Sequence, residues 1–259
     1  MKIKLILSSL ISCWFSLFLV FYSHVYASDQ IKIVHFAEEA NWPPFTLNKF
    51  GIATEGLSLA LMQAIFSRLE IEVEIELLPQ KRMLEYLKRG SKDGATVISI
   101  NSERSQFLDF SAPLFAKRGY IHYKTDRKNP IEWDTFENLQ GLIIGIVEGH
   151  NYGEDFARAV KRYNLNIEKL SQERQGFDLL LAERIDCFLC IDLTANQFMK
   201  ESKFKGKITH APKSYYGKDY HIAFSKRSNA RFLIPRVNKI IQEIRFDGSL
   251  NKMLAPYFE

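Results

Sequence analysis

Residues 99–115 read SINSERSQFLDFSAPLF, and this stretch decides the fold. The apolar run at residues 95–100 predicts a buried strand, a polar turn follows at residues 101–103, and Arg104 comes next. Open α/β sheets bind ligands in the crevice beyond the carboxyl ends of their strands, so we expect Arg104 at the mouth of such a crevice. Its planar guanidinium can grip a carboxylate through two parallel hydrogen bonds. An arginine on a loop can equally be an exposed surface residue, and the local pattern leaves that alternative open.

The same block resembles the signature of bacterial extracellular solute-binding proteins of family 3. That signature places a hydroxyl residue, an E-R pair and an F-S-x-P segment in this order. Members of the family are periplasmic receptors for amino acids and similar solutes, and they feed ABC importers. The resemblance implies that Arg104 clamps the α-carboxylate of the ligand and that Ser99, five positions earlier, helps to hold it.

A second segment of the resemblance is the aromatic loop at residues 41–45, NWPPF, which follows a predicted strand at residues 31–36. Its two prolines exclude regular structure and predict a rigid loop. Trp42 and Phe45 could simply close the hydrophobic core. The resemblance implies instead that Trp42 stacks on the ligand with Phe45 behind it, and that Glu39 reads the ligand side chain.

The third segment is GLIIGIVEGHNYG at residues 141–153, a predicted buried strand with a glycine-bearing turn after it. Backbone N–H groups at such a strand-to-helix turn favour a bound anion. The turn has neither GxGxxG nor GK[ST], which argues against a nucleotide site. In the family, the residue after the glycine contacts the ligand carboxylate. Here that residue is His150, where the family usually has a hydroxyl side chain.

Asp192 is one position away from a family acid. In the family, an acid five residues after an R-x-D motif binds the α-amine of the ligand, and the corresponding position here is Ile191. Asp192 also stands where the predicted helix at residues 192–202 needs an N-cap. Helix capping, ligand contact and both together remain open.

Strands and helices are predicted to alternate along the chain, which indicates an α/β fold with parallel strands. The predicted strands include residues 71–78, which alternate strictly with a glutamate face toward water, and residues 166–170 and 187–191. The predicted helices include residues 54–69 and residues 80–89, the latter ended by Gly90. The resemblance covers about residues 28–259 and implies a two-lobed periplasmic-binding-protein fold of type II, the Venus-flytrap fold. Lobe 1 would comprise residues 28–118 with 221–259, and lobe 2 residues 119–220. Two hinge crossings are expected, near residues 119–124 and 215–220.

Residues 1–27 have the features of a cleavable signal peptide. Lys2 and Lys4 precede an apolar run at residues 5–22, and Val-Tyr-Ala ends the segment, so we expect cleavage after Ala27. An uncleaved membrane anchor is the alternative, because the apolar run is nearly long enough to span a bilayer. Cleavage changes the formal charge of the chain from +5 to +3, since two lysines leave (5 − 2).

Several kinds of chemistry are disfavoured by the sequence. The charge is not concentrated in a basic block, which gives nucleic-acid binding little support. The six histidines form no HxH or HExxH motif, and no GxSxG is present, so neither a metal site nor a serine hydrolase is expected. Cys187 and Cys190 form a C-x-x-C inside an apolar strand, CFLCI. Three residues apart on a strand, they point to opposite faces, which favours core packing over a disulfide.

The predicted function is that of a periplasmic solute-binding protein without a cofactor. The expected ligand is a small carboxylate-bearing molecule, with a polar amino acid as the first expectation. The expected partner is an ABC permease in the inner membrane, and the chain is expected to act as a monomer. Two alternatives remain: an enzyme resembling cyclohexadienyl dehydratases, with Glu39 as its acid, and a binding protein that reports to a membrane sensor.

Overall fold

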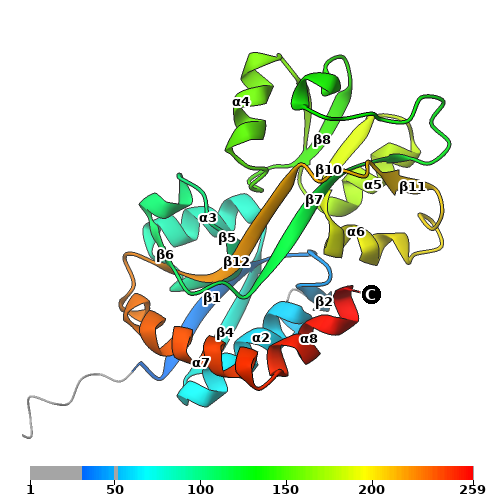
Figure 1. Cartoon of the computed structure of the whole chain (residues 1–259). Coiled ribbons are helices and arrows are strands. Elements are labelled where there is room, and N and C mark those ends of the chain that lie inside the picture. The colour runs from blue at the N-terminus through cyan, green and yellow to red at the C-terminus, as the bar shows by residue number, and fades with distance from the viewer. Residues whose placement is uncertain (1–30, 50–51, 259) are drawn as a thin grey trace, which may run out of the picture. The chain divides into compact units, whose positions relative to one another are not determined.

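The computed structural model describes residues 31–49 and 52–258, and Ile33–Glu259 forms one compact unit (Figure 1). The predicted signal peptide, residues 1–27, lies outside the described residues. Within these described ranges, no helix has both the length and the apolar character that crossing a membrane requires.

Strands and helices alternate along the chain, as the sequence predicts for an α/β protein. The strands are β1 (Ile33–Glu39), β2 (Leu47–Lys49), β3 (Ile52–Glu55), β4 (Glu72–Leu78), β5 (Gly94–Ser99), β6 (Leu108–Phe110), β7 (Phe115–Lys124), β8 (Ile143–Val147), β9 (Asn166–Leu170), β10 (Cys187–Ile191), β11 (Ile208–His210) and β12 (Tyr216–Ser225). The α-helices are α2 (Leu57–Phe66), α3 (Gln80–Arg89), α4 (Glu154–Arg162), α5 (Glu173–Leu181), α6 (Asp192–Met199), α7 (Ile234–Phe246) and α8 (Ser249–Phe258). The 3₁₀ helices are η1 (Ser67–Leu69), η2 (Arg104–Gln106), η3 (Phe136–Leu139) and η4 (Asn229–Leu233).

The first part of the sheet is built around β1, which pairs in parallel with both β4 and β5. Strand β4 shows the predicted alternation, with exposed glutamates at 72, 74 and 76. Helix α3 begins at Gln80 and ends at Gly90, whose left-handed backbone conformation closes it as predicted. Because parallel strands end at the same edge, the carboxyl ends of β1 and β5 lie together, at Glu39 and Ser99.

The second part of the sheet is also built around a strand with two parallel partners. Strand β8 pairs in parallel with β9 and with β10, so their carboxyl ends also share one edge. The predicted strands at residues 166–170 and 187–191 match β9 and β10. Strand β10 pairs antiparallel with β7 on its other side.

Strands β7 and β12 connect the two parts of the sheet. They pair antiparallel from Tyr216 opposite Gly119 to Tyr220 opposite Phe115. Beyond this shared segment, β7 continues against β10 and β12 continues against β5. Figure 1 shows the two long strands running side by side from one part to the other. The crossings predicted near residues 119–124 and 215–220 fall on these strands, and their action as hinges remains a prediction.

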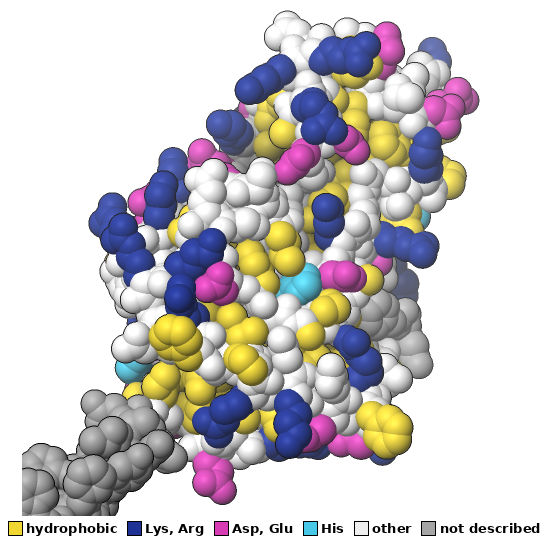
Figure 2. Space-filling model, turned by 60° about the vertical axis from the view of Figure 1, so that its left-hand side comes forward, with side chains coloured by type: hydrophobic (Ala, Val, Ile, Leu, Met, Phe, Trp, Pro, Cys, Tyr) yellow, Lys and Arg dark blue, Asp and Glu magenta, His cyan; other side chains and the backbone are white. Residues whose placement is uncertain are grey.

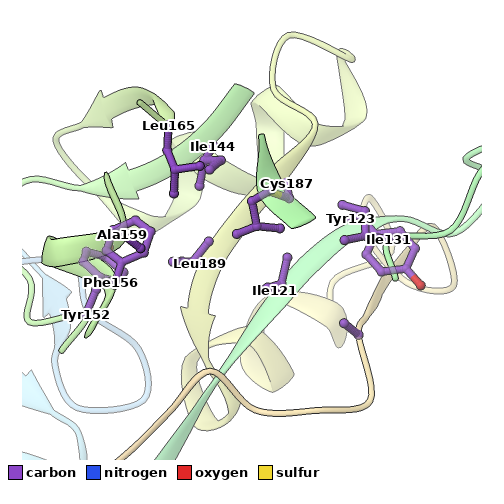
Figure 3. Packing of buried hydrophobic residues seen from close by; sticks show 12 residues of the cluster. Ile121, Tyr123, Ile131, Ile144, Tyr152, Phe156, Ala159, Leu165, Cys187 and Leu189 are labelled. Atoms are coloured by element: carbon purple, nitrogen blue, oxygen red, sulfur yellow. The ribbon is translucent and has the colours of Figure 1, made fainter. Parts of the chain in front are cut away.

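The hydrophobic core of the second part lies on both faces of β10. Cys187 and Leu189 point into one cluster, together with Ile121 of β7 and Phe156 of α4 (Figure 3). Cys190 belongs to a different cluster, on the opposite face. Both cysteines are free and buried, so the prediction of core packing rather than a disulfide is confirmed.

The predicted start of the first helix is wrong, and a hairpin precedes this helix. The sequence was expected to enter a helix at Thr54, but this residue lies in β3, which forms a hairpin with β2, and α2 begins at Leu57. The hairpin was not predicted, because strands of three and four residues offer too few positions for an alternating pattern. The last predicted turn of this helix, to Leu69, is the 3₁₀ helix η1.

The surface carries charges of both signs. On the face shown in Figure 2, Lys and Arg side chains are interspersed with Asp and Glu side chains. This agrees with the dispersed charge of the sequence, and the face offers no continuous basic surface of the kind that binds nucleic acid.

Gly94 is predicted to tolerate no side chain. A Cβ at this position would overlap the carbonyl oxygen of Ala223 on β12 and lie 2.6 Å from the Phe36 ring. We expect Gly94→Ala to lower the free energy of unfolding by about 2 kcal/mol, measured by urea denaturation. Gly217→Ala on β12 is the matched control, because nothing lies within 4 Å of its Cβ, and its effect should stay within about 0.5 kcal/mol. Equal losses in both variants would contradict this packing argument.

Candidate functional site

The candidate site is a small cavity, of about 30 Å³, at the carboxyl ends of the strands. Glu39 ends β1, Ser99 ends β5 and Ile191 ends β10, and all three residues line the cavity. The other lining residues are Trp42, Gln80, Val97, Ile98, Arg104, His150, Asn151, Tyr152, Glu173, Leu189, Cys190, Tyr215 and Tyr220. The cavity therefore lies where a sheet with parallel strands is expected to bind a ligand.

Arg104 is almost completely buried, with 4% of its surface exposed. Its Nη1 donates hydrogen bonds to the carbonyl oxygen of Ser99 at 2.9 Å and to the Ser99 hydroxyl at 3.1 Å. Its Nη2 donates to the carbonyl oxygen of Gly149 at 3.0 Å. Nε and the second N–H of Nη2 have no hydrogen-bond partner among the described residues, so two donors remain, the number a carboxylate accepts from a guanidinium. Burial lowers the pKa of Arg104, but arginine stays protonated in proteins.

The turn after β8 contacts the segment after β5. Asn151 donates from Nδ2 to the Ser99 hydroxyl and to the carbonyl oxygen of Ile100, both at 3.0 Å. Gln80 donates from Nε2 to the carbonyl oxygen of Gly149 at 3.4 Å. Together with Arg104, these bonds fix the backbone of the glycine-bearing turn over the cavity.

His150 lies between two carboxylates. Its Nε2 is 2.6 Å from Oε2 of Glu39, and its Nδ1 is 3.4 Å from Oε1 of Glu173. Burial by itself lowers the pKa of His150, but the two carboxylates outweigh burial, and the pKa is raised overall. The side chains of Glu39 and Glu173 are only 5% and 3% exposed, so this is a buried charge cluster.

Glu173 is the first residue of α5 and points into the cavity from the second part of the sheet. Burial raises its pKa to about 7, although His150 nearby acts in the opposite direction. The thiol of Cys190 donates a hydrogen bond to its Oε2 at 3.5 Å. A carboxyl group in this environment is partly protonated near neutral pH. A cation nearby favours its ionised form.

Lys117 of β7 places its ammonium group inside a box of aromatic rings. Its Nζ lies 3.1 Å from the ring centre of Phe45, 4.0 Å from that of Tyr220 and 4.5 Å from that of Trp42. The residue is 1% exposed, and Nζ has no hydrogen-bond partner among the described residues. Burial lowers the pKa of Lys117 well below its usual value, while the rings offer cation–π attraction to the charged form.

The structure brings most of the predicted site residues together. Glu39, Trp42, Ser99, Arg104 and His150 line one cavity, although they come from three separate segments of the chain. Their contact with a ligand remains a prediction.

Two predicted residues lie outside the cavity lining. Phe45 is buried next to Trp42, with ring centres 4.3 Å apart, and does not line the cavity. Asp192 is half-buried at the start of α6. Its expected N-cap position is wrong by one residue: the N-cap is Ile191, because α6 begins directly after β10. Its carboxylate still accepts a hydrogen bond from the backbone N–H of Leu193 at 2.8 Å, where a negative charge is favourable near a helix start.

Sequence reasoning missed Glu173, Asn151, Gln80 and Lys117. A signal existed for Glu173, because it closely follows β9 at the edge where strands of this sheet end. Asn151 directly follows the predicted His150. Lys117 had no signal, since a lysine on an amphipathic strand is ordinarily exposed. In the described part of the chain, no group of three or more His, Cys, Asp or Glu side chains could hold a metal ion.

The fold and the cavity define a two-lobed solute-binding protein. The family model for bacterial extracellular solute-binding proteins, family 3, matches residues 34–259, and the chain belongs to this family. The predicted family and fold class are thereby confirmed.

Three similar proteins illustrate the relationship. The "Probable amino-acid-binding protein YxeM" of Bacillus subtilis (strain 168) is 21% identical over 233 residues, which cover 90% of this chain and 86% of the relative. A "Probable histidine-binding protein" of Neisseria gonorrhoeae is 23% identical over 243 residues, covering 90% and 85%. The solved structure of an ancestral arginine-binding protein bound to arginine superposes with a TM-score of 0.76 at 23% identity, covering 88% of this chain and 99% of that chain.

The buried Glu38 next to this site gives a prediction about pH. Burial raises its pKa to about 8, so between pH 4.5 and 8 the folded protein holds a proton that the unfolded chain releases. The free energy of unfolding must therefore fall as the pH rises through this window, by up to about 1.4 kcal/mol per pH unit for one group. We expect Glu38→Gln to be close to wild type at pH 5 and clearly more stable than wild type at pH 9, measured by urea denaturation.

The control for the loss of a carboxylate is Glu72→Gln, at an exposed position of β4. A stability gain of Glu38→Gln that is the same at pH 5 and pH 9 would show that Glu38 is not protonated in the folded state.

Proposed function

We propose that the protein is a periplasmic receptor that captures a polar amino acid for an ABC importer. The observation that carries this proposal is the buried guanidinium of Arg104, which donates hydrogen bonds to the carbonyl oxygens of Ser99 and Gly149 and lines the cavity. Such a fork binds a carboxylate in the two-bond geometry that charge-assisted hydrogen bonds favour. The relatives described as binding amino acids support the same ligand class.

In this proposal, the residues of the first part of the sheet bind the common part of the ligand. Arg104 clamps the α-carboxylate, and the Ser99 hydroxyl accepts or donates a hydrogen bond next to it. Trp42 stacks on the ligand, and Phe45 supports the Trp42 ring from behind, since their ring centres are 4.3 Å apart. Glu39 lies at the end of the cavity where it can read the ligand side chain.

The residues of the second part complete the pocket. His150 lines the cavity from the turn after β8. Asp192 lies at the start of α6, and its half-buried carboxylate attracts the positively charged α-amine of the ligand. Burial raises the pKa of Asp192, and its bond to the Leu193 N–H acts in the opposite direction.

Binding requires the two lobes to open and close. We assign lobe 1 to residues 28–118 with 221–259 and lobe 2 to residues 119–220, so that β7 and β12 carry the hinges. The cavity, at about 30 Å³, is small for an amino acid, so the ligand enters when the lobes separate. Closure around the ligand excludes water and strengthens the hydrogen bonds that hold it. The proposed partner is a permease in the inner membrane, with the receptor acting as a monomer.

The ligand clamp is tested with Arg104→Ala. Isothermal titration against a panel of L-amino acids and prephenate should show that wild type binds at least one amino acid. The variant should bind it about 100-fold more weakly, because removing one partner of a buried charged pair costs about 3 kcal/mol. Arg158→Ala on α4, whose side chain is 68% exposed, is the matched control and should bind like wild type.

Two results would contradict the proposal. If Arg104→Ala binds the amino acid as tightly as wild type, Arg104 is not the clamp. If wild type converts prephenate and binds no amino acid, the protein is an enzyme of the dehydratase type rather than a receptor.

The periplasmic location gives a separate prediction. The predicted cleavage after Ala27 means that the mature protein begins at Ser28. Mass spectrometry of the protein released from the periplasm of an expressing bacterium should find this N-terminus. The variant Ala27→Arg should remain unprocessed, because signal peptidase needs a small residue before the cut. A wild-type protein that stays in the membrane with residues 1–27 attached would show an anchor instead.

A further inference from the structure

The two carboxylates of the cavity share one internal cation. Glu39 comes from β1 and Glu173 from α5, and His150 contacts both, at 2.6 Å and 3.4 Å. The imidazole thus lies between an acid of the first part of the sheet and an acid of the second part. This is the position that a cationic group of a ligand would occupy in a closed cleft.

The charges of the cavity lining favour this reading. Its acids are Glu39 and Glu173, and its bases are Arg104 and His150. Arg104 bonds to oxygens of Ser99 and Gly149 and not to either carboxylate, so its charge is available to a ligand carboxylate. If the imidazole moved away, two buried carboxylates would face the cavity without a cation, which is strongly unfavourable.

Two aromatic rings of the cavity are already in contact with a cation. Trp42 and Tyr220 line the cavity, and the centres of both rings lie near Nζ of Lys117, at 4.5 Å and 4.0 Å. A cationic side chain entering the cavity therefore finds its strongest partners in the carboxylates rather than in these rings.

The position of the His150 ring leads to the same conclusion. The ring lies between the carboxylates of Glu39 and Glu173, within 2.6 Å and 3.4 Å of their oxygens. A cationic group that pairs with both carboxylates therefore takes the place of this ring.

We propose that Glu39 and Glu173 form a subsite for the cationic side chain of a basic amino acid, and that the His150 side chain is an internal occupant which this ligand displaces. The inference rests on the proposed function, because Arg104 holds the α-carboxylate of the same ligand. It adds that His150 determines specificity by competing for the cation subsite.

The test compares His150→Ala with wild type by isothermal titration, using L-arginine, L-lysine and L-histidine against L-glutamine and L-glutamate. Removing the competitor should tighten binding of the basic amino acids by about tenfold. Glu39→Gln should weaken their binding by about tenfold or more and change the affinity for L-glutamine less. The control is His35→Ala, which removes an exposed histidine–glutamate pair, His35–Glu74 at 2.8 Å, from the other end of β1, and it should stay within about twofold of wild type.

The outcomes separate this inference from the proposed function. If wild type prefers L-glutamine or L-glutamate, or if His150→Ala weakens the binding of every amino acid, the cation subsite is wrong and the amino-acid receptor stands. If no amino acid binds, both proposals fall.

A second measurement needs no variant. The histidine ring signals of the wild-type protein, followed by NMR through a pH titration, give the pKa of His150 with and without L-arginine. The charged groups that face the ring are Glu39 of β1, Glu173 of α5 and Arg104 of η2. Saturating L-arginine should lower the pKa of His150, because the ligand takes both carboxylates from it. A pKa that stays the same or rises would overturn the proposed displacement.

Discussion

The buried guanidinium of Arg104 is the constraint on which the cleft depends. A charge removed from water is destabilising by several kcal/mol unless hydrogen bonds replace its hydration. Ser99 provides two of these bonds, and Gly149, 45 residues after Arg104, provides the third. One side chain thus ties the turn after β8 to the end of β5. Because Arg104 also has N–H donors without a partner among the described residues, the interaction that joins these two segments leaves donors for an anion.

A second buried cation links the cavity wall to a crossing strand. Lys117 lies on β7, and its ammonium contacts the rings of Trp42, Phe45 and Tyr220. Trp42 and Tyr220 line the cavity, and Tyr220 belongs to the other crossing strand, β12. Movement of β7 relative to β12 would therefore disturb the cavity wall directly. Through these contacts, closure of the lobes and the shape of the binding site would depend on each other.

Features that depend on neighbouring residues could be predicted from the sequence, whereas contacts between distant segments could not. Arg104 and Ser99 are five residues apart, so their shared site follows from one strand and one turn. Strand β10 is fully buried, and its predicted range, residues 187–191, matches the structure. By contrast, Glu39 and His150 are 111 residues apart, and nothing local to either one indicates a 2.6 Å contact. Glu173, the hairpin β2–β3 and the aromatic box of Lys117 depend likewise on tertiary packing, which overrides local pattern.

An internal salt bridge at a binding site changes selectivity as well as affinity. Every ligand that needs the space of the His150 side chain must break its contact with Glu39. A neutral ligand then leaves Glu39 and Glu173 as buried carboxylates without a cation, which is unfavourable. A ligand with its own cation restores the pairing and recovers the lost interaction. The free energy that separates the two kinds of ligand thus comes from the protein's own charges, and the discrimination is a difference between affinities rather than a single strong contact.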